Sequence, residues 1–222
     1  MSDVPTQDKR PVHDERTLEF PREFPVGSVF IRTARNAWHF HSPAKSTVSI
    51  PRDASVRLEL SLDACYHPGA MASIPSSGIH QLIARRLPVQ REDLQPVGKW
   101  QDLEALSLIS CPVGDEALEA LTGLRKLRAL DLSGTCITSA GMITLAKLTA
   151  LEALTINGVD VDDYGLACLA AIEKLQSLRF ARTVAGDGGF GALEPLTELR
   201  EIEFSTRNTD ASIYLLQRHP RI

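Results

Sequence analysis

Residues 127–150 read LRALDLSGTCITSAGMITLAKLTA, and residues 151–174 read LEALTINGVDVDDYGLACLAAIEK. Both segments have 24 residues and open with Leu-x-x-Leu-x-Leu or its Ile variant. A fixed period of this length predicts a solenoid, because each unit is too small to bury its apolar side chains without its neighbours. The first position of the motif recurs without insertion or deletion at Leu103, Leu127, Leu151, Leu175 and Leu199.

Each unit combines two periodicities. In Leu-x-x-Leu-x-Leu the last two apolar residues are two apart, as on the buried face of a β-strand. Further on, apolar residues such as Leu118, Leu121 and Leu124 follow at steps of three, which suits a short helix or 3₁₀ segment. A residue with a short oxygen-bearing side chain precedes each helical segment, and we expect it to cap the helix. These residues are Asp115, Ser139, Asp163 and Asp187.

The two complete units at 127–174 resemble those of bacterial leucine-rich-repeat proteins with 24-residue repeats. The resemblance covers residues 79–222 well and residues 55–78 weakly. It implies an α/β leucine-rich-repeat solenoid with a parallel β-sheet on the concave face and short helices on the convex face. It also implies that another protein is the ligand, although this fold is a scaffold with many partners and does not identify one.

The two ends of the chain differ from the repeats. Residues 1–19 are polar and contain Pro5 and Pro11, so we expect a disordered tail. Residues 20–54 contain strand-like runs punctuated by Pro, Gly and Ser, which predict a small N-terminal β cap. Residues 55–222 then form the solenoid of about seven units. Its first and last units are atypical, because the outer face of a terminal unit meets water.

Composition excludes several classes of function. The chain has 222 residues, 43% hydrophobic and 23% charged, with a net charge of −4. This charge argues against a nucleic-acid partner, and no apolar run is long enough to predict a membrane span. The start of the chain has no signal-peptide pattern, so we expect a cytoplasmic monomer. In that setting the four cysteines, Cys65, Cys111, Cys136 and Cys168, are expected to be reduced thiols.

Two motifs that could bind a ligand are better explained as turns and caps. The Gly-rich run at 186–191 has no following Gly-Lys-Ser/Thr, so we interpret it as a turn rather than a phosphate loop. Asp160, Asp162 and Asp163 lack the Gly and Glu that a calcium-binding loop requires at its sixth and twelfth positions. We therefore predict no metal and no cofactor.

Catalytic residues are not evident either, and we predict that the protein is not an enzyme. His80 is expected to face solvent, and Glu201 and Glu203 to share one exposed strand face. One metal alternative stays open. The pairs His39/His41 and Cys65/His67 each have a spacing of two, so neighbouring strands could bring four ligands together around zinc in a metal-dependent enzyme.

The main hypothesis is a protein-binding scaffold or adaptor that uses the concave face. A bacterial effector that acts on host proteins is the alternative. Alanines at 105, 129 and 153 form an apolar stripe edged by both charges, and Gly134 and Gly158 are expected to leave room for a second chain. The candidate binding residues are Ala105, Ser107, Ile109, Arg128, Ala129, Asp131, Ala153, Thr155, Asn157, Arg179, Arg182 and Glu203.

Overall fold

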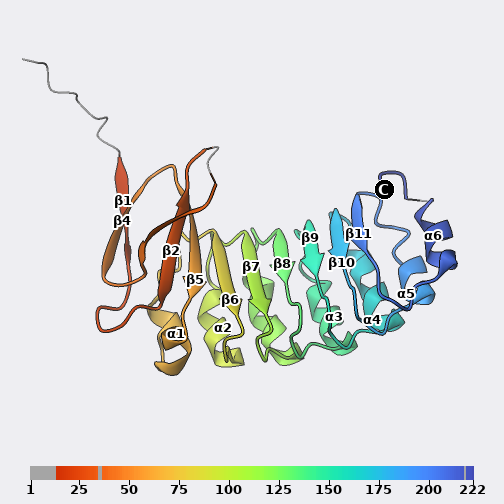
Figure 1. Ribbon diagram of the computed structural model, residues 1–222, viewed down its shortest axis with the longest axis horizontal. Helices are drawn as coiled ribbons and strands as arrows, with labels where there is room; N and C mark the ends of the chain where they lie inside the picture. The colour runs from red at the N-terminus through yellow and green to blue at the C-terminus, as the bar shows by residue number, and fades with distance from the viewer. Residues whose placement is uncertain (1–13, 35–36, 218) are drawn as a thin grey trace, which may run out of the picture.

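One long sheet organises the molecule. A computed structural model of the chain describes residues 14–34, 37–217 and 219–222. Within these residues a nine-stranded sheet runs from end to end in the order β11-β10-β9-β8-β7-β6-β5-β2-β3. Figure 1 shows the strands side by side, with the short helices lined up along one face of the sheet. The architecture is the predicted leucine-rich-repeat solenoid.

The strands of the repeats pair in parallel. Each residue lies beside the residue 24 positions further on, as Leu106 does with Leu130 and Leu130 with Leu154. The predicted parallel pairing of the repeat strands is therefore confirmed. The parallel strands are β5 (Ser55–Leu60), β6 (Gln81–Arg85), β7 (Ala105–Ile109), β8 (Ala129–Asp131), β9 (Ala153–Thr155), β10 (Ser177–Arg179) and β11 (Glu201–Glu203).

Short helical segments follow the strands, as the steps of three predict. The longest of the 3₁₀ segments is η2, where side chains three residues apart lie on one side. The segments are α1 (Asp63–Tyr66), η1 (Met71–Ser73), α2 (Arg91–Val97), η2 (Asp115–Gly123), α3 (Ser139–Leu145), α4 (Asp163–Cys168), η3 (Leu169–Ala171), α5 (Asp187–Gly191) and α6 (Asp210–Leu216).

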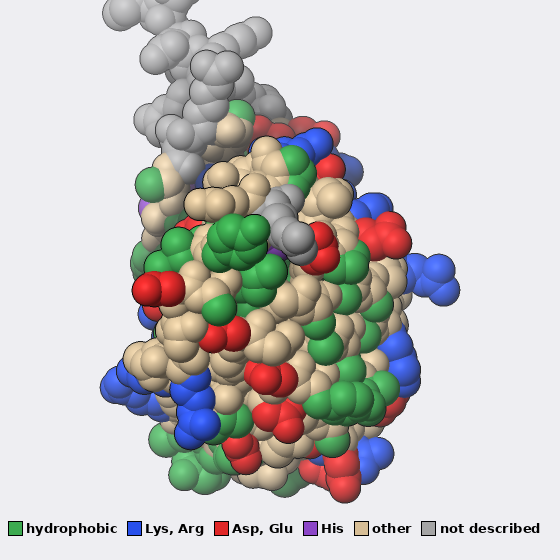
Figure 2. All heavy atoms as spheres, turned by 90° about the vertical axis from the view of Figure 1, so that its right-hand side faces the viewer, with side chains coloured by type: hydrophobic (Ala, Val, Ile, Leu, Met, Phe, Trp, Pro, Cys, Tyr) green, Lys and Arg blue, Asp and Glu red, His purple; other side chains and the backbone are tan. Residues whose placement is uncertain are grey.

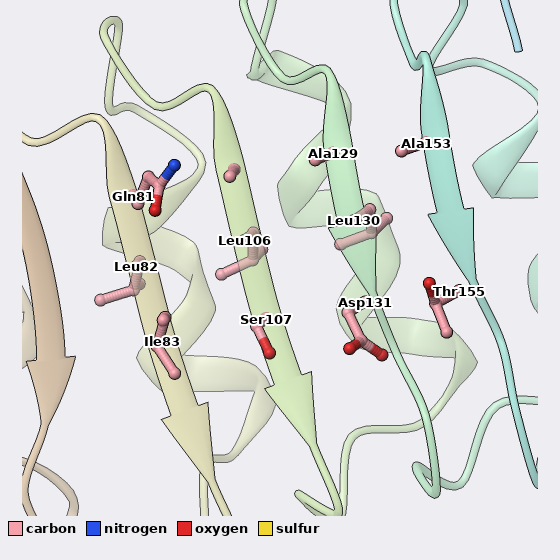
Figure 3. A pocket seen from close by; sticks show the side chains of 11 residues that line it. Gln81, Leu82, Ile83, Leu106, Ser107, Ala129, Leu130, Asp131, Ala153 and Thr155 are labelled. Carbon is pink, nitrogen blue, oxygen red and sulfur yellow. The ribbon is translucent and has the colours of Figure 1, made fainter. Parts of the chain in front are cut away.

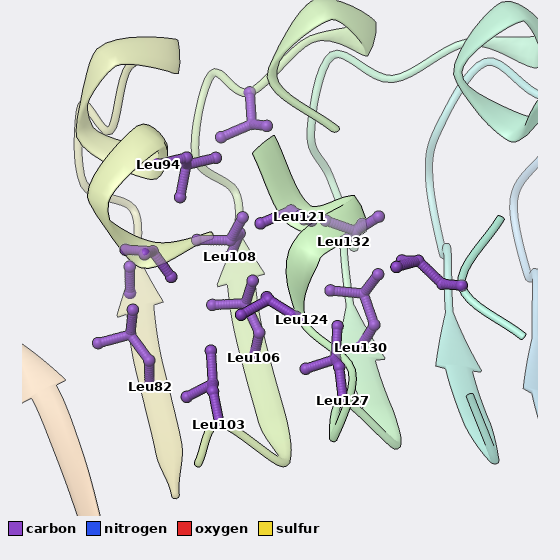
Figure 4. Packing of buried hydrophobic residues seen from close by; sticks show 14 of the residues in the cluster. Leu82, Leu94, Leu103, Leu106, Leu108, Leu121, Leu124, Leu127, Leu130 and Leu132 are labelled. Atoms are coloured by element: carbon purple, nitrogen blue, oxygen red, sulfur yellow. The ribbon is translucent and has the colours of Figure 1, made fainter. Parts of the chain in front are cut away.

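The core is a continuous layer between the sheet and the helices. Leu106, Leu108, Leu130 and Leu132 are all at most 2% exposed. Figure 4 shows these leucines stacked from one unit to the next, with leucines of the helical segments closing the layer. No unit has a core of its own, so each unit is stabilised by the apolar area that it buries against its neighbours.

The first corrections concern the helix starts. Thr138, Asp162 and Thr209 are the actual N-caps, each accepting a hydrogen bond from a backbone N–H of its own first turn. The predicted caps stand one residue later. Asp115, for example, accepts hydrogen bonds from the Thr138 N–H at 2.8 Å and from its hydroxyl at 2.6 Å.

The same bonding repeats along the stack. The Asp163 carboxylate accepts from the Gly186 N–H at 2.6 Å, and the Asp187 carboxylate from the Thr209 N–H at 2.9 Å. Ser139 donates to the Asp162 carboxylate at 2.5 Å. The predicted caps Asp115, Ser139, Asp163 and Asp187 therefore tie each unit to the next rather than cap a helix. The Gly-rich run at 186–191 is not the predicted turn. Gly186 supplies one of these donors, and the rest of the run, Asp187–Gly191, forms α5.

The N-terminal cap shares the long sheet. β2 (Gly27–Arg32) pairs antiparallel with β5 on one side and with β3 (His39–Pro43) on the other. β1 (Glu15–Glu19) pairs with β4 (Thr47–Pro51) in a separate two-stranded sheet. The prediction of disorder was therefore wrong for residues 15–19, while residues 1–13 lie outside the described residues. Because β2 covers the edge of β5, the cap continues the sheet that the repeats extend.

The last unit closes the array with polar groups. Its helix begins at Asp210, 23 residues after the start of α5, so this unit is one residue shorter than the period of 24. Ser212 is fully buried and donates a hydrogen bond to the Asp187 carboxylate at 2.5 Å. Ile213 is 57% exposed, although it occupies the position of the repeat at which Leu166 and Phe190 are buried. Figure 2 looks onto this end, where hydrophobic side chains lie among acidic ones.

A left-handed turn follows the strand in five units. Gly134 and Gly158 have φ of +64° and +67°, a conformation that costs a residue with a Cβ about 1–2 kcal/mol. This backbone conformation favours glycine whether or not a partner binds, and the proposal that these glycines leave room for a partner stays a prediction. The turn residues are Arg86, Ser110, Gly134, Gly158 and Arg182.

The columns of the core give the first testable prediction. Leu132→Ala is expected to lower the free energy of unfolding by about 2–5 kcal/mol, because Leu132 is fully buried between units. Ser107→Ala, at an outward position whose hydroxyl has no hydrogen-bond partner in the described structure, is expected to change it by no more than about 0.5 kcal/mol. Urea unfolding measures the free energy of unfolding of both variants. Equal losses for the two variants would contradict the assignment of Leu132 as inward and Ser107 as outward.

The turns give the second prediction. Gly158→Ala is expected to lower the free energy of unfolding by about 1–2 kcal/mol. A Cβ on Gly158 would meet nothing within 4 Å, so the loss would come from the backbone alone. Gly191→Ala in α5 is the control, and helix propensity predicts a gain of up to about 1 kcal/mol. A loss at Gly191 equal to that at Gly158 would contradict the left-handed turn as the cause.

Candidate functional site

The concave face is the sheet face opposite the helices. Its side chains come from alternate residues of the parallel strands, and the register aligns them in two rows across the sheet. The first row is Arg57, Gln81, Ala105, Ala129, Ala153, Ser177 and Glu201. The second row is Glu59, Ile83, Ser107, Asp131, Thr155, Arg179 and Glu203.

A shallow depression, here called the central hollow, lies in the middle of this face. It has a volume of about 160 Å³ and is open to solvent. Figure 3 shows the alanines of β8 and β9 beside one another, with Ser107, Asp131 and Thr155 in the next row. The lining residues are Gln81, Leu82, Ile83, Ala105, Leu106, Ser107, Ala129, Leu130, Asp131, Ala153 and Thr155.

Half of the candidate binding residues line this hollow. Three others lie elsewhere on the face: Ile109 at the end of β7, Arg179 on β10 and Glu203 on β11. The structure places the remaining candidates, Arg128, Asn157 and Arg182, outside the strands. The candidates in the hollow are Ala105, Ser107, Ala129, Asp131, Ala153 and Thr155.

The three candidates outside the strands have other contacts or positions. Arg128 precedes β8 and forms an ion pair with Glu152. Asn157 follows β9, and its side-chain oxygen accepts a hydrogen bond from the Ala181 N–H at 2.7 Å. Arg182 occupies the left-handed turn after β10. These three therefore lie outside the strands, and their contact with a partner stays a prediction.

Apart from its three leucines, the hollow has two lining residues that were not among the candidates, Gln81 and Ile83. Both lie on β6, whose buried residues Leu82 and Ala84 fit the repeat frame. Alternation along a strand would have placed Gln81 and Ile83 outward, so the signal was present in the sequence.

An aromatic side chain borders the N-terminal end of the concave face. Trp38 lies between two guanidinium groups, at 4.8 Å from that of Arg32 and 4.4 Å from that of Arg57. Arg57 belongs to the first row and donates a hydrogen bond to the Gln81 side chain at 3.1 Å. Burial lowers the pKa of Arg57, and the nearby Glu59 partly offsets this effect. Trp38 thus adds to the face an aromatic group that the repeat pattern does not contain.

Carboxylates gather at the other end. Arg179 on β10 forms an ion pair with Glu201 on β11, and this hydrogen bond raises the pKa of Arg179. Glu203 and Asp131 act in the same direction through their charges. The same ion pair lowers the pKa of Glu201. Arg179 is therefore already neutralised by its neighbours on the sheet.

Asp131 is the one charged residue that lines the hollow. One carboxylate oxygen, Oδ1, accepts hydrogen bonds from the Ser133 N–H at 3.0 Å and from the Ser133 hydroxyl at 2.7 Å. Within the described residues Asp131 has no ion-pair partner at contact distance. The hollow thus combines an apolar floor with one carboxylate oxygen, Oδ2, that has no hydrogen bond from the described residues.

The proposed zinc ligands do not come together. The His67 ring stacks on Phe24 at 3.7 Å, and the His41 Nε2 donates to the Ser49 carbonyl at 2.7 Å. Burial raises the pKa of Cys65 to about 11, which disfavours a thiolate ligand. In residues 14–34, 37–217 and 219–222, no three His, Cys, Asp or Glu side chains are placed to hold a metal ion. Cys65 and His67 belong to α1 and its end rather than to a strand.

His80 also differs from expectation. It is half-buried rather than solvent-facing, and its Nδ1 accepts a hydrogen bond from the Val56 N–H at 3.1 Å. Burial lowers the pKa of His80, which keeps the ring neutral as this hydrogen bond requires. The imidazole therefore joins β5 to the next unit.

Among the helices that the structure describes, none is both long and apolar enough to cross a bilayer.

Taken together, the parallel register, the helical layer and the open sheet face define a leucine-rich-repeat solenoid. Residues 123–146 match the family model described as Leucine Rich repeat. Internalin C2 from Listeria monocytogenes is a similar solved structure, with 28% identity and a TM-score of 0.50 over 60% of this chain. The match spans 55% of the internalin chain. These findings confirm the resemblance to bacterial leucine-rich-repeat proteins. A comparison with curated proteins gives no match.

Proposed function

We propose that this protein is a non-enzymatic scaffold that binds another protein through its concave face. The observation that carries the proposal is the central hollow, an apolar depression in the middle of a sheet face that the helices leave open. Small side chains at Ala105, Ala129 and Ala153 let the backbone of a second chain approach the sheet. Asp131 lines the same hollow and is a charge that can orient a partner.

The size of the face suggests a moderate affinity. Seven parallel strands about 4.8 Å apart span roughly 29 Å, and the outward rows extend about 20 Å along them. The resulting area of about 600 Å² is below the roughly 800 Å² that each partner buries in a standard interface. Trp38 at the N-terminal end can add contact area, and tryptophan is frequent among residues that dominate binding energy.

The histidine contacts favour binding over catalysis. His41, His67 and His80 each form a hydrogen bond with a backbone atom, so none of them is held against a hydroxyl or thiol nucleophile. The cysteines at 65, 111, 136 and 168 are all free thiols, which suits a reducing compartment such as the cytoplasm. Among the residues that the structure describes, no contact favours the alternative of an effector that acts on host proteins.

The concave-face proposal predicts the effect of two charges at its centre. A partner is first captured from the source organism and its affinity for the unmodified protein is measured. Ala129→Glu together with Ala153→Glu is expected to weaken binding at least tenfold, because two carboxylates then stand where the partner should make apolar contact. Both alanines face outward, so the variant should keep its circular dichroism spectrum.

The matched control puts the same charges on the convex side. Ala140→Glu with Ala171→Glu changes two exposed helical residues and should leave the affinity unchanged. If the convex variant loses binding while the concave variant retains it, the partner binds the helices and the proposal is wrong.

A further inference from the structure

We propose that the central hollow receives a lysine side chain of the partner protein, with its ammonium on Asp131. This inference rests on the proposed function and identifies the chemistry of the residue that the partner inserts. The hollow has one charged lining residue, and that residue is negative. A cation is therefore the complementary charge for an occupant.

The protein's own cations do not neutralise Asp131 by contact. Arg179, two strands away, is engaged by Glu201. Arg57, at the other side of the hollow, bonds to Gln81, pairs with Glu59 at 3.6 Å and stacks on Trp38. Each of these guanidinium groups has a carboxylate of its own. The Asp131 charge is thus available to a group that comes from outside.

The floor of the hollow fits the stem of a long side chain. Ala105, Ala129 and Ala153 lie side by side on three neighbouring strands, so the floor is about 10 Å across. A lysine stem is four methylene groups long and can cover apolar surface while its head stays polar. Ile83 adds an apolar wall on the β6 side.

The carboxylate geometry favours lysine over arginine. Arginine binds a carboxylate best with two parallel hydrogen bonds, one to each oxygen. Both Ser133 donors already occupy Oδ1 of Asp131, which leaves Oδ2 for an incoming donor. A compact ammonium needs only one such oxygen.

A second group in the hollow lacks a partner. The Ser107 hydroxyl oxygen is buried and forms no hydrogen bond within the described residues. Buried polar groups in folded proteins nearly always have partners, so an orphaned one beside a carboxylate marks a place where a donor is expected. Ser107 is aligned with Asp131 on the neighbouring strand (Figure 3). A change of its rotamer would let the hydroxyl accept a second hydrogen bond from the same ammonium.

Amide chemical shifts of the whole protein test this inference with defined probes. Nα-acetyl-lysinamide is titrated against Nα-acetyl-norleucinamide, which has nearly the same stem and no charge, and against Nα-acetyl-argininamide. The lysine probe should shift the amides of Ala105, Ala129 and Asp131, and bind about threefold to tenfold more tightly than the norleucine probe. Raising the salt to about 1 M should reduce this preference.

Two variants decide the role of the carboxylate. Asp131→Asn should bring the lysine and norleucine affinities to within about twofold of each other. Glu116→Gln, which removes an exposed carboxylate of η2 on the helical side, should leave the preference intact. Shifts confined to other surfaces, a stronger arginine probe, or an unchanged preference in Asp131→Asn would overturn the inference.

The two proposals can fail separately. If Ala129→Glu with Ala153→Glu abolishes capture of the partner but the probes show no lysine preference, the lysine inference is wrong and the concave-face proposal stands. If that double variant binds its partner normally, the concave-face proposal is wrong whatever the probes show.

Discussion

Burial of leucines between neighbouring units is the interaction on which the rest of the structure depends. A strand of three residues, such as β8, and one or two helical turns expose too much apolar surface to fold alone. Leu106 and Leu130 lie in register on adjacent strands, so each unit completes the core of the unit before it. Asp115 and the related side chains add hydrogen bonds between units at the helix starts.

This packing also creates the concave face. Because inward residues must alternate with outward ones along each strand, fixing Leu130 in the core fixes Ala129 and Asp131 on the opposite face. The parallel register then brings Ala105 and Ala153 beside Ala129. Packing of the core constrains the inward residues and does not determine which side chains stand at these outward positions. The side chains of the hollow are therefore free to be chosen for binding rather than for stability.

The sequence predicts the parts that follow from this alternation, and it fails where a distant contact decides. Leucine spacing alone places the strand centres and the alanine stripe. The residues of β3 are mostly exposed and do not alternate, so its pairing with β2 defines this strand. The contact of Trp38 with Arg57 depends on how the cap folds over β5. Asp131 was chosen as a candidate, but its lack of an ion-pair partner depends on Arg179 pairing with Glu201.

Hydrogen exchange tests the central claim, that the units form one stack in parallel register. The backbone N–H groups of Leu132, Ile156 and Phe180 each donate to a carbonyl of the next unit, at 2.8–3.0 Å. These amides should be among the most protected in the protein and should exchange with similar free energies, whereas those of exposed loop residues Thr149 and Lys174 should exchange rapidly. Exchange of the three strand amides as fast as that of the loop residues would contradict the stack.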